Sequence, residues 1–258
     1  MRPVVKRLLF GRRGLVNAEA AALVARFTTP PTNARKVLID NFIGALKTAG
    51  VWSKLDALHV TAAADSQAAR QNWVQDAYNL TAFSSPVFTA DRGYTPDGSA
   101  SYLDSGFNPT TAVGAKFLLD DAHMGAWHLT DLANAGAISF DFGNANSRLV
   151  NSATAATTPK PNLATAPAPI TENYAKHKAW TRSAAAVWEY YNSGVDTGGG
   201  VDASTAFTNF SFGLGRTAAA SFGLNQCALM HWGGNLTSGE VLALYNAANT
   251  YMQAVGAA

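Results

Sequence analysis

The sequence predicts a mainly β protein, in which an antiparallel β-sandwich follows a helical segment and is closed by a short C-terminal helix. Two observations carry this prediction. Helical spacing of apolar residues is confined to roughly the first eighty and the last twenty residues. Between them, from residue 83 onward, short β-branched or aromatic runs alternate with Gly, Asn, Asp and Pro, as strands alternate with turns.

Composition supports a folded chain with few charges. Of 258 residues, 48% are hydrophobic and only 14% are charged, against roughly a quarter charged in an average protein. The net charge of +2 is too small to argue for nucleic acid, and the basic first thirteen residues are best interpreted as a solvated tail. No apolar run is long enough for a membrane span. We therefore expect neither a membrane partner nor a specific nucleic-acid partner.

The helical segment comes first along the chain. Asn17 is a plausible N-cap for a helix over residues 18–26, and apolar spacing predicts a second helix over 33–49. Residues 52–58 continue a helical spacing, and a further short helix over 66–74 is expected to turn Trp73 inward.

The middle of the chain is predicted to be β-structure. The expected strands are 87–89, 101–105, 115–119, 125–130, 137–142, 148–151, 175–182, 186–192, 209–215 and 227–232. The Ala-, Thr- and Pro-rich residues 152–169 are expected to form an extended surface loop, and the glycines at 198–200 a hairpin or loop tip.

The last helix has the clearest local signal. Thr237 and Glu240 have the spacing of a capping box, and an apolar helical face follows them. The predicted organisation is therefore an N-terminal arm with a helical anchoring segment over residues 1–82 and a β-sandwich over residues 83–258.

Several motifs resemble a known family. Residues 88–109, which end in Tyr102-Leu-Asp-Ser-Gly-Phe-Asn-Pro109, resemble the opening of concanavalin A-like lectin/glucanase domains in phage tail and other virion proteins. Residues 189–194 and 212–215 are similar to a strand-and-turn and a late strand of laminin-G-like domains, and residues 230–245 to their last strand and helix. Residues 39–58 resemble the helical lead of the phage versions, so the resemblance covers about residues 33–255.

This resemblance implies a concanavalin A-like jelly roll in a bacteriophage particle, either as a tail protein or as a capsid decoration. The implied localisation is the virion, assembled in the host bacterial cytoplasm, with other virion proteins as partners and a homo-oligomeric state. The N-terminal segment would anchor the protein, and the lectin-like sandwich would serve host attachment through bacterial surface polysaccharide.

The sequence offers little for catalysis, so we expect a non-catalytic structural protein with no catalytic residue. Glycoside hydrolysis needs two carboxyl groups that flank the scissile bond. The four glutamates, at 19, 172, 189 and 240, lack the spacing that hydrolases of this fold carry. The alternatives are a polysaccharide-depolymerising hydrolase, with Asp121, Asp141 and Glu189 as poor candidates, or a capsid decoration protein without a ligand.

No cofactor is expected, although calcium is possible. The weak calcium candidates are Asp120, Asp121 and Asp141, and turn-forming roles are the plainer interpretation of these residues. The five histidines contain no helical pair of the kind that binds zinc.

Carbohydrate contact is the most plausible small-molecule role, because sugar faces stack on aromatic rings and polar side chains bind hydroxyls. The predicted carbohydrate-binding residues are Trp127, His128, Trp180, Trp188, Tyr190 and Asn192. Strand alternation sends Trp188 and Tyr190 to one face and Glu189 and Tyr191 to the other, and one of these pairs should be core.

Overall fold

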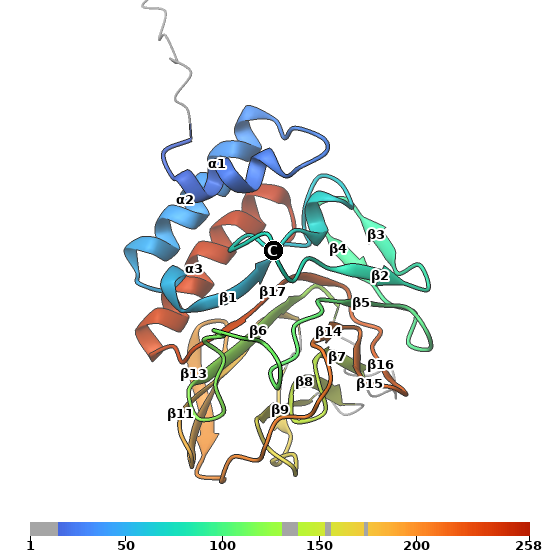
Figure 1. Cartoon of the computed structure of the whole chain (residues 1–258), viewed down its shortest axis with the longest axis vertical. Helices are drawn as coiled ribbons and strands as arrows, with labels where there is room; N and C mark the ends of the chain where they lie inside the picture. The colour runs from blue at the N-terminus through green and yellow to red at the C-terminus, as the bar shows by residue number, and fades with distance from the viewer. Residues whose placement is uncertain (1–14, 131–138, 153–155, 173–174) are drawn as a thin grey trace, which may run out of the picture.

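The computed structural model describes residues 15–130, 139–152, 156–172 and 175–258. These residues form two large antiparallel sheets, a two-stranded ribbon and three α-helices (Figure 1). This mainly β architecture agrees with the expected β-sandwich.

The larger sheet has eight strands in the order β13-β12-β11-β6-β17-β4-β3, with β1 paired to the same edge of β17 as β4. Its strands are β1 (Leu55–His59), β3 (Val87–Thr89), β4 (Gly93–Thr95), β6 (Ala122–His128), β11 (Lys176–Ala184), β12 (Val187–Asn192), β13 (Val195–Gly200) and β17 (Cys227–Gly233).

The smaller sheet has seven strands in the order β10-β9-β8-β7-β14-β5-β2. Its strands are β2 (Thr81–Phe83), β5 (Tyr102–Asp104), β7 (Ser139–Gly143), β8 (Ser147–Ser152), β9 (Ala156–Pro161), β10 (Ile170–Thr171) and β14 (Gly213–Leu214). The ribbon pairs β15 (Arg216–Ala218) with β16 (Ser221–Phe222).

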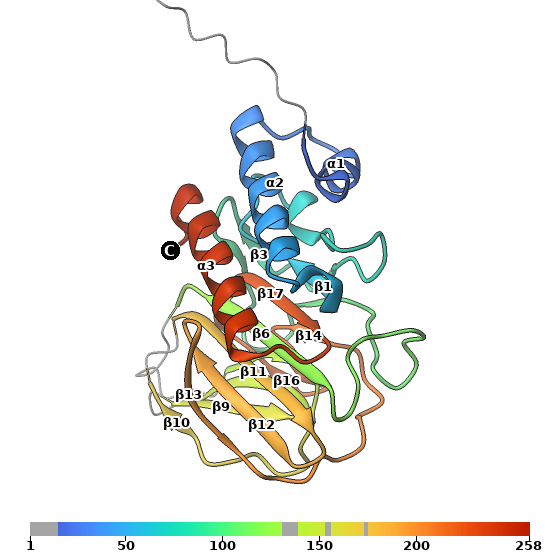
Figure 2. The ribbon, with the colours of Figure 1, turned by 90° about the vertical axis from the view of Figure 1, so that its left-hand side faces the viewer.

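The helices α1 (Ala18–Ala25), α2 (Asn33–Thr48) and α3 (Ser238–Val255) lie together on one face of the larger sheet (Figures 1 and 2). The predicted capping box at Thr237 and Glu240 is confirmed. Asn17 precedes α1 as expected, but its side chain bonds Asp40 instead of capping the helix. None of the described helices is both long and apolar enough to span a membrane.

Two hydrophobic cores result. One lies between the helices and the larger sheet, and the other between the two sheets, where Phe107, Phe142, Phe212 and Trp232 pack against one another. Both faces of the larger sheet are therefore covered. The first core joins residues on both sides of position 82, so the helical segment and the sandwich share buried surface. The boundary at 82/83 stays a prediction.

Two segments differ from their predictions around residue 56. Residues 52–54 form a 3₁₀ turn, and residues 55–59 form the buried strand β1 instead of the expected helix. The prediction was wrong because an apolar run this short fits a strand buried on both faces as well as a helix. Residues 115–119 form no strand. The amides of Lys116 and Phe117 instead donate to the buried Asp56 carboxylate at 2.8–3.0 Å, and burial raises the pKa of that carboxyl.

The segment 152–169, predicted to be a loop, contains the largely buried strand β9. Its prolines explain the error, since proline disfavours central strands. Among the described residues, β10 pairs with β9 at Ala156 and Thr157, whereas Pro159 and Pro161 pair with β8 alone. The glycines at 198–200 likewise belong to strand β13, which pairs with β12.

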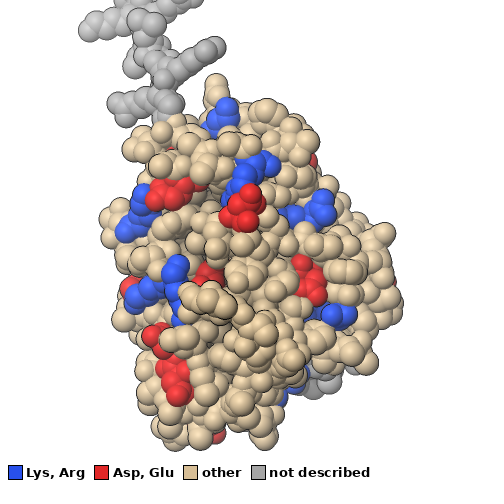
Figure 3. All heavy atoms as spheres, viewed as in Figure 1, with Lys and Arg blue, Asp and Glu red and all other residues tan. Residues whose placement is uncertain are grey.

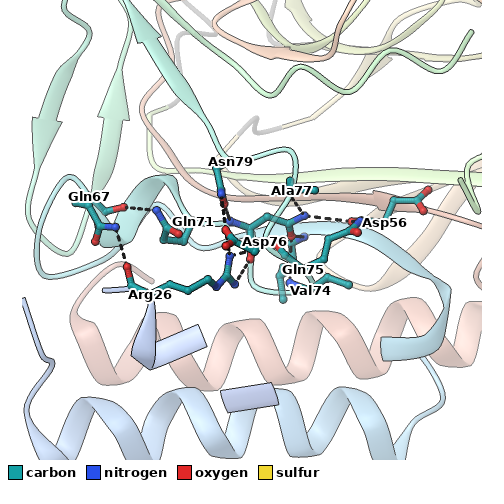
Figure 4. Close-up of polar contacts among 11 residues, drawn as sticks. Arg26, Asp56, Gln67, Gln71, Val74, Gln75, Asp76, Ala77 and Asn79 are labelled. Atoms are coloured by element: carbon teal, nitrogen blue, oxygen red, sulfur yellow. Dashed lines mark hydrogen bonds and ion pairs between the residues drawn. The ribbon is translucent and has the colours of Figure 1, made fainter. Parts of the chain in front are cut away.

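A polar network joins Arg26, at the end of α1, to the loop after β1 and to β1 of the larger sheet (Figure 4). The fully buried Asn72 donates to the backbone oxygens of Asp56 and Ala77 and accepts from the amides of Leu58 and Val74. Arg26, just after α1, donates to the Asn72 backbone oxygen at 2.6 Å. This network satisfies the backbone of a segment without regular structure, which otherwise carries unpaired polar groups.

Candidate functional site

The predicted carbohydrate-binding residues are mostly interior. Trp127, His128, Trp180 and Tyr190 are fully buried, Trp188 is 5% exposed and Asn192 is partly buried. The Trp127 ring stacks on Tyr245 of α3, and the Trp180 ring packs edge-on against Phe117 between the sheets. Neither indole offers a free face on which a sugar can stack in this structure.

Tyr190 and Asn192 converge on Glu172, which follows β10. The Tyr190 hydroxyl donates to Glu172 Oε1, and Asn192 Nδ2 donates to Glu172 Oε2 at 2.8 Å. Lys178 Nζ lies 3.6 Å from the same carboxylate. Burial, with the nearby Glu172 charge, raises the pKa of Tyr190 well above its usual value. The contacts of Glu172 with Lys178, Tyr190 and Asn192 thus join the end of the smaller sheet to the larger sheet.

The calcium candidates Asp120 and Asp121 are engaged in protein contacts. Ser204 Oγ donates to Asp120, and the Asn235 amide donates to Asp121, both at 2.5 Å. Asp141 lies on β7, but its side chain is outside the described residues. Within the described ranges, no group of three or more His, Cys, Asp or Glu side chains is arranged to hold a metal ion.

Three histidines lie in a row beneath the helices. His177 and His231 share a hydrogen bond of 2.9 Å between their Nε2 atoms, and the His123 ring centroid lies 5.1 Å from that of His231. Burial is the main cause that lowers the pKa of His123 to about 4 and of His177 to about 3. The row is therefore neutral and belongs to the folded core.

A partly accessible cluster at the edge of the smaller sheet has the chemistry that the buried residues lack. We call it the aromatic platform, and it consists of Phe83, Tyr102, Phe210, Arg216 and Phe222. Phe83 and Tyr102 lie on the paired strands β2 and β5 of the smaller sheet. Phe210 precedes β14, and Arg216 and Phe222 lie on the β15–β16 ribbon; β2, β5 and the ribbon are on the right-hand side of Figure 1.

Tyr102 is the centre of the platform. Its ring stacks on Phe83, its cross-strand neighbour, at 4.8 Å and 9°. The Arg216 guanidinium carbon lies 3.8 Å from the Tyr102 ring centroid and 4.7 Å from that of Phe210. Phe83 is 40% exposed and the other members are partly buried. The result is a stack in which Phe83 is the most exposed ring.

Polar groups border the platform. Asp104, two residues after Tyr102 and on the same face of β5, accepts from Ser211 Oγ at 2.8 Å and lies 3.9 Å from Arg216. Guanidinium donors and carboxylate acceptors therefore lie beside aromatic surface. On the face shown in Figure 3, the charged groups stand apart between wide uncharged areas.

The sequence analysis missed the platform, although one signal for it was present. In the expected strand 101–105, Leu103 is the apolar residue, which sends Tyr102 and Asp104 together to the opposite face. The structure buries Leu103 completely and leaves both neighbours partly accessible. The positions of Phe83 and Arg216 depend on strand order, which the sequence did not reveal.

Comparisons with known proteins bear on the fold. No family model matches the chain, and no curated protein matches it. A mutant Trypanosoma rangeli sialidase with trans-sialidase activity is similar in structure, with a TM-score of 0.57 and 11% identity over 84% of this chain and 40% of the sialidase. The T. rangeli sialidase in complex with sialic acid has a TM-score of 0.55, 13% identity, and coverage of 83% and 39%.

The binding domain of botulinum neurotoxin serotype D is also similar, with a TM-score of 0.54 and 8% identity over 76% of this chain and 52% of the toxin chain. This chain thus spans about 40% of the sialidases and about half of the toxin chain. Identities this low show a shared fold and transfer no residue roles.

The prediction that the protein is not an enzyme is contradicted by these comparisons. The structures that share its fold include sialidases, which are enzymes. The missing glutamate spacing excludes one carboxylate pattern, and the prediction was wrong to extend that to catalysis in general.

Proposed function

We propose that this chain is a carbohydrate-binding β-sandwich module and that the aromatic platform contacts the glycan. The observation that carries the proposal is the partly accessible stack of Phe83, Tyr102 and Arg216 with Asp104 beside it. The C–H face of a sugar packs on aromatic rings, while guanidinium and carboxylate groups bind its hydroxyls. An arginine also suits carboxylated sugars, because its donors match carboxylate geometry.

The comparisons give this proposal limited support. One similar structure is a sialidase that holds sialic acid, and another is the binding domain of a toxin. Both show that this fold occurs in proteins or domains with a binding role. The platform itself supplies the argument for where a glycan would lie on this chain.

Binding to immobilised bacterial polysaccharides, both neutral and carboxylated, tests the proposal. We expect saturable binding that Phe83→Ala or Tyr102→Ala weakens about tenfold, since each removes a stacking ring. Leu242→Ala is the matched control, because Leu242 on α3 is 43% exposed and lies outside the platform. Binding that both platform variants retain at full strength would refute the assignment of the platform.

We further propose, from the resemblance of residues 88–109, that the module is a concanavalin A-like jelly roll of a phage particle, at its tail or capsid surface. Residues 1–82 would anchor it to other virion proteins, and oligomeric display would place several platforms side by side. Such multivalency raises weak affinities by about 10²–10⁴-fold.

Mass spectrometry of purified phage particles tests whether the protein is a virion component. We expect the protein in several copies per particle, and we expect loss of residues 1–82 to remove it from particles. Because the helices share a core with the larger sheet, loss of the truncated protein from particles supports an anchoring role only if the truncated chain remains folded. A protein abundant in the lysate but absent from particles would contradict the proposal.

A further inference from the structure

A second site lies on the helical side of the molecule and is independent of the platform. A pocket of about 190 Å³ opens between the α1–α2 linker, helix α2 and the loop after β1. We call it the seam pocket. Its lining is Phe27, Thr29, Pro30, Pro31, Thr32, Arg35, Ile39, Ala63, Ala64, Asp65, Ala68, Trp73 and Tyr251.

The seam pocket has an accessible rim and a buried floor. Thr29, Pro30 and Ala64 at its lining are exposed, whereas Ile39 and Tyr251 are at most 2% exposed. The floor is aromatic, since the Trp73 and Tyr251 rings meet edge to face with centroids 5.7 Å apart. A molecule that enters would exchange water for apolar contact on several sides.

Hydrogen bonds hold the walls in place without a ligand. Gln67 Nε2 donates to the Arg26 oxygen, as Figure 4 shows, and Gln67 Oε1 accepts from the Thr28 amide, both at 3.0 Å. Asp65 Oδ1 accepts from the amides of Gln67 and Ala68. These bonds tie the linker to the loop opposite it. The pocket is therefore preformed, which reduces the entropy that a ligand must offset.

Two donors of the lining have capacity for a ligand. Among the described residues, Arg35 makes two hydrogen bonds, from Nη1 to the Tyr251 hydroxyl at 2.9 Å and from Nη2 to Asp91 at 2.5 Å, and a guanidinium has five donors. Trp73 is 3% exposed, and its Nε1 has no hydrogen-bond partner within the described part of the chain. A buried donor of this kind favours an acceptor in its vicinity.

We propose that the seam pocket binds a small single-ring aromatic carboxylate. The volume argues for one ring, because an apolar protein cavity of about 150 Å³ holds benzene. The aromatic floor suits a flat apolar body. The guanidinium of Arg35 suits a carboxylate on that body, through charge-assisted hydrogen bonds.

Ligand-observed NMR with benzoate and with uncharged benzyl alcohol tests the proposal on the full chain. We expect benzoate to bind with a dissociation constant of about 1 mM or tighter, within reach of a ligand of this size. Arg35→Gln should weaken benzoate about tenfold and benzyl alcohol much less, because only the carboxylate uses the charge.

A variant at the mouth of the seam pocket distinguishes binding inside the pocket from unspecific binding elsewhere on the protein. Ala64→Trp places a large ring at the exposed mouth and should abolish binding of both probes. Val37→Trp is the matched control, since Val37 lies on α2, is 53% exposed and does not line the pocket. Circular dichroism of both variants is the control for folding. Absence of saturable benzoate binding, or binding that Ala64→Trp leaves unchanged, would overturn the proposal.

Discussion

Acidification from pH 7.5 to pH 5.5 is expected to lower the free energy of unfolding by about 7 kcal/mol. All five histidines are buried, and burial lowers the pKa of His59, His128 and His177 to about 3, of His123 to about 4, and of His231 well below its usual value. In the unfolded chain each has a pKa of about 6.5, so the unfolded state binds protons first.

The sign follows from this depression of the pKa in the folded state. The stabilising contribution of neutral histidines is fully present above about pH 6.5 and is lost as the pH falls below it. At pH 5.5 each histidine accounts for about 1.4 kcal/mol, and five for about 7 kcal/mol. Such a loss rivals the total stability of an ordinary domain, about 5–15 kcal/mol. In the unfolded chain the carboxyl groups have pKa values of about 4, below this window.

Urea unfolding at both pH values, followed by circular dichroism, measures the effect. His59→Phe provides the internal control, because it removes one titrating group from a position that packs beside Trp232, and it should reduce the pH dependence by about one fifth. A change below about 1.5 kcal/mol between the two pH values would mean that the histidines protonate within the folded protein.

Gly125→Ala is expected to destabilise the fold by about 3 kcal/mol, at the upper end of typical overpacking costs. A Cβ at Gly125 would lie 2.3 Å from His231 Nε2 and 3.0 Å from the Ala179 Cβ. Gly125 on β6 faces His231 on β17 and Ala179 on β11, so the missing side chain provides the space in which His177 and His231 meet. The substituted chain must displace the His231 ring and break that hydrogen bond.

Gly239→Ala is the matched control for this substitution. An added Cβ there has no atom within 4 Å, and the residue lies in the first turn of α3, where alanine is the better helix former by about 1 kcal/mol. We expect this variant to match or exceed the stability of the original chain. If thermal unfolding ranks the two variants equally, the histidine row does not depend on the space at Gly125.

Local signals predicted the three α-helices, but the helix expected over residues 66–74 is only a 3₁₀ turn over Ala68–Arg70. The capping box at Thr237 marked the start of α3, and the apolar spacing after Asn33 marked α2. Strands failed where two descriptions fit the same residues: β1 is too short for periodicity to distinguish from a helix, and β9 contains prolines that normally indicate a loop. The prolines of β9 are tolerated because the neighbouring strand β10 is too short to pair with them. The length of β10 cannot be read from the local sequence of β9.

The candidate site shows the same limit. Alternation along residues 187–192 correctly put Trp188 and Tyr190 on one face and Tyr191 on the other, but the larger sheet is covered by the smaller sheet on one side and by α3 on the other. Both faces are core for that reason. Tyr102 lies on a strand whose outer face remains partly accessible. Which face stays accessible depends on long-range packing.

Whether the platform contacts the glycan is tested by chemical-shift mapping of the isotope-labelled protein with a polysaccharide that it binds. The largest amide shifts are expected on β2, β5 and β15, around Phe83, Tyr102 and Arg216, and they should be clearly smaller in Tyr102→Ala at the same sub-saturating ligand concentration. Shifts concentrated instead around Trp188 and Asn192, with the amides of the platform unmoved, would contradict it.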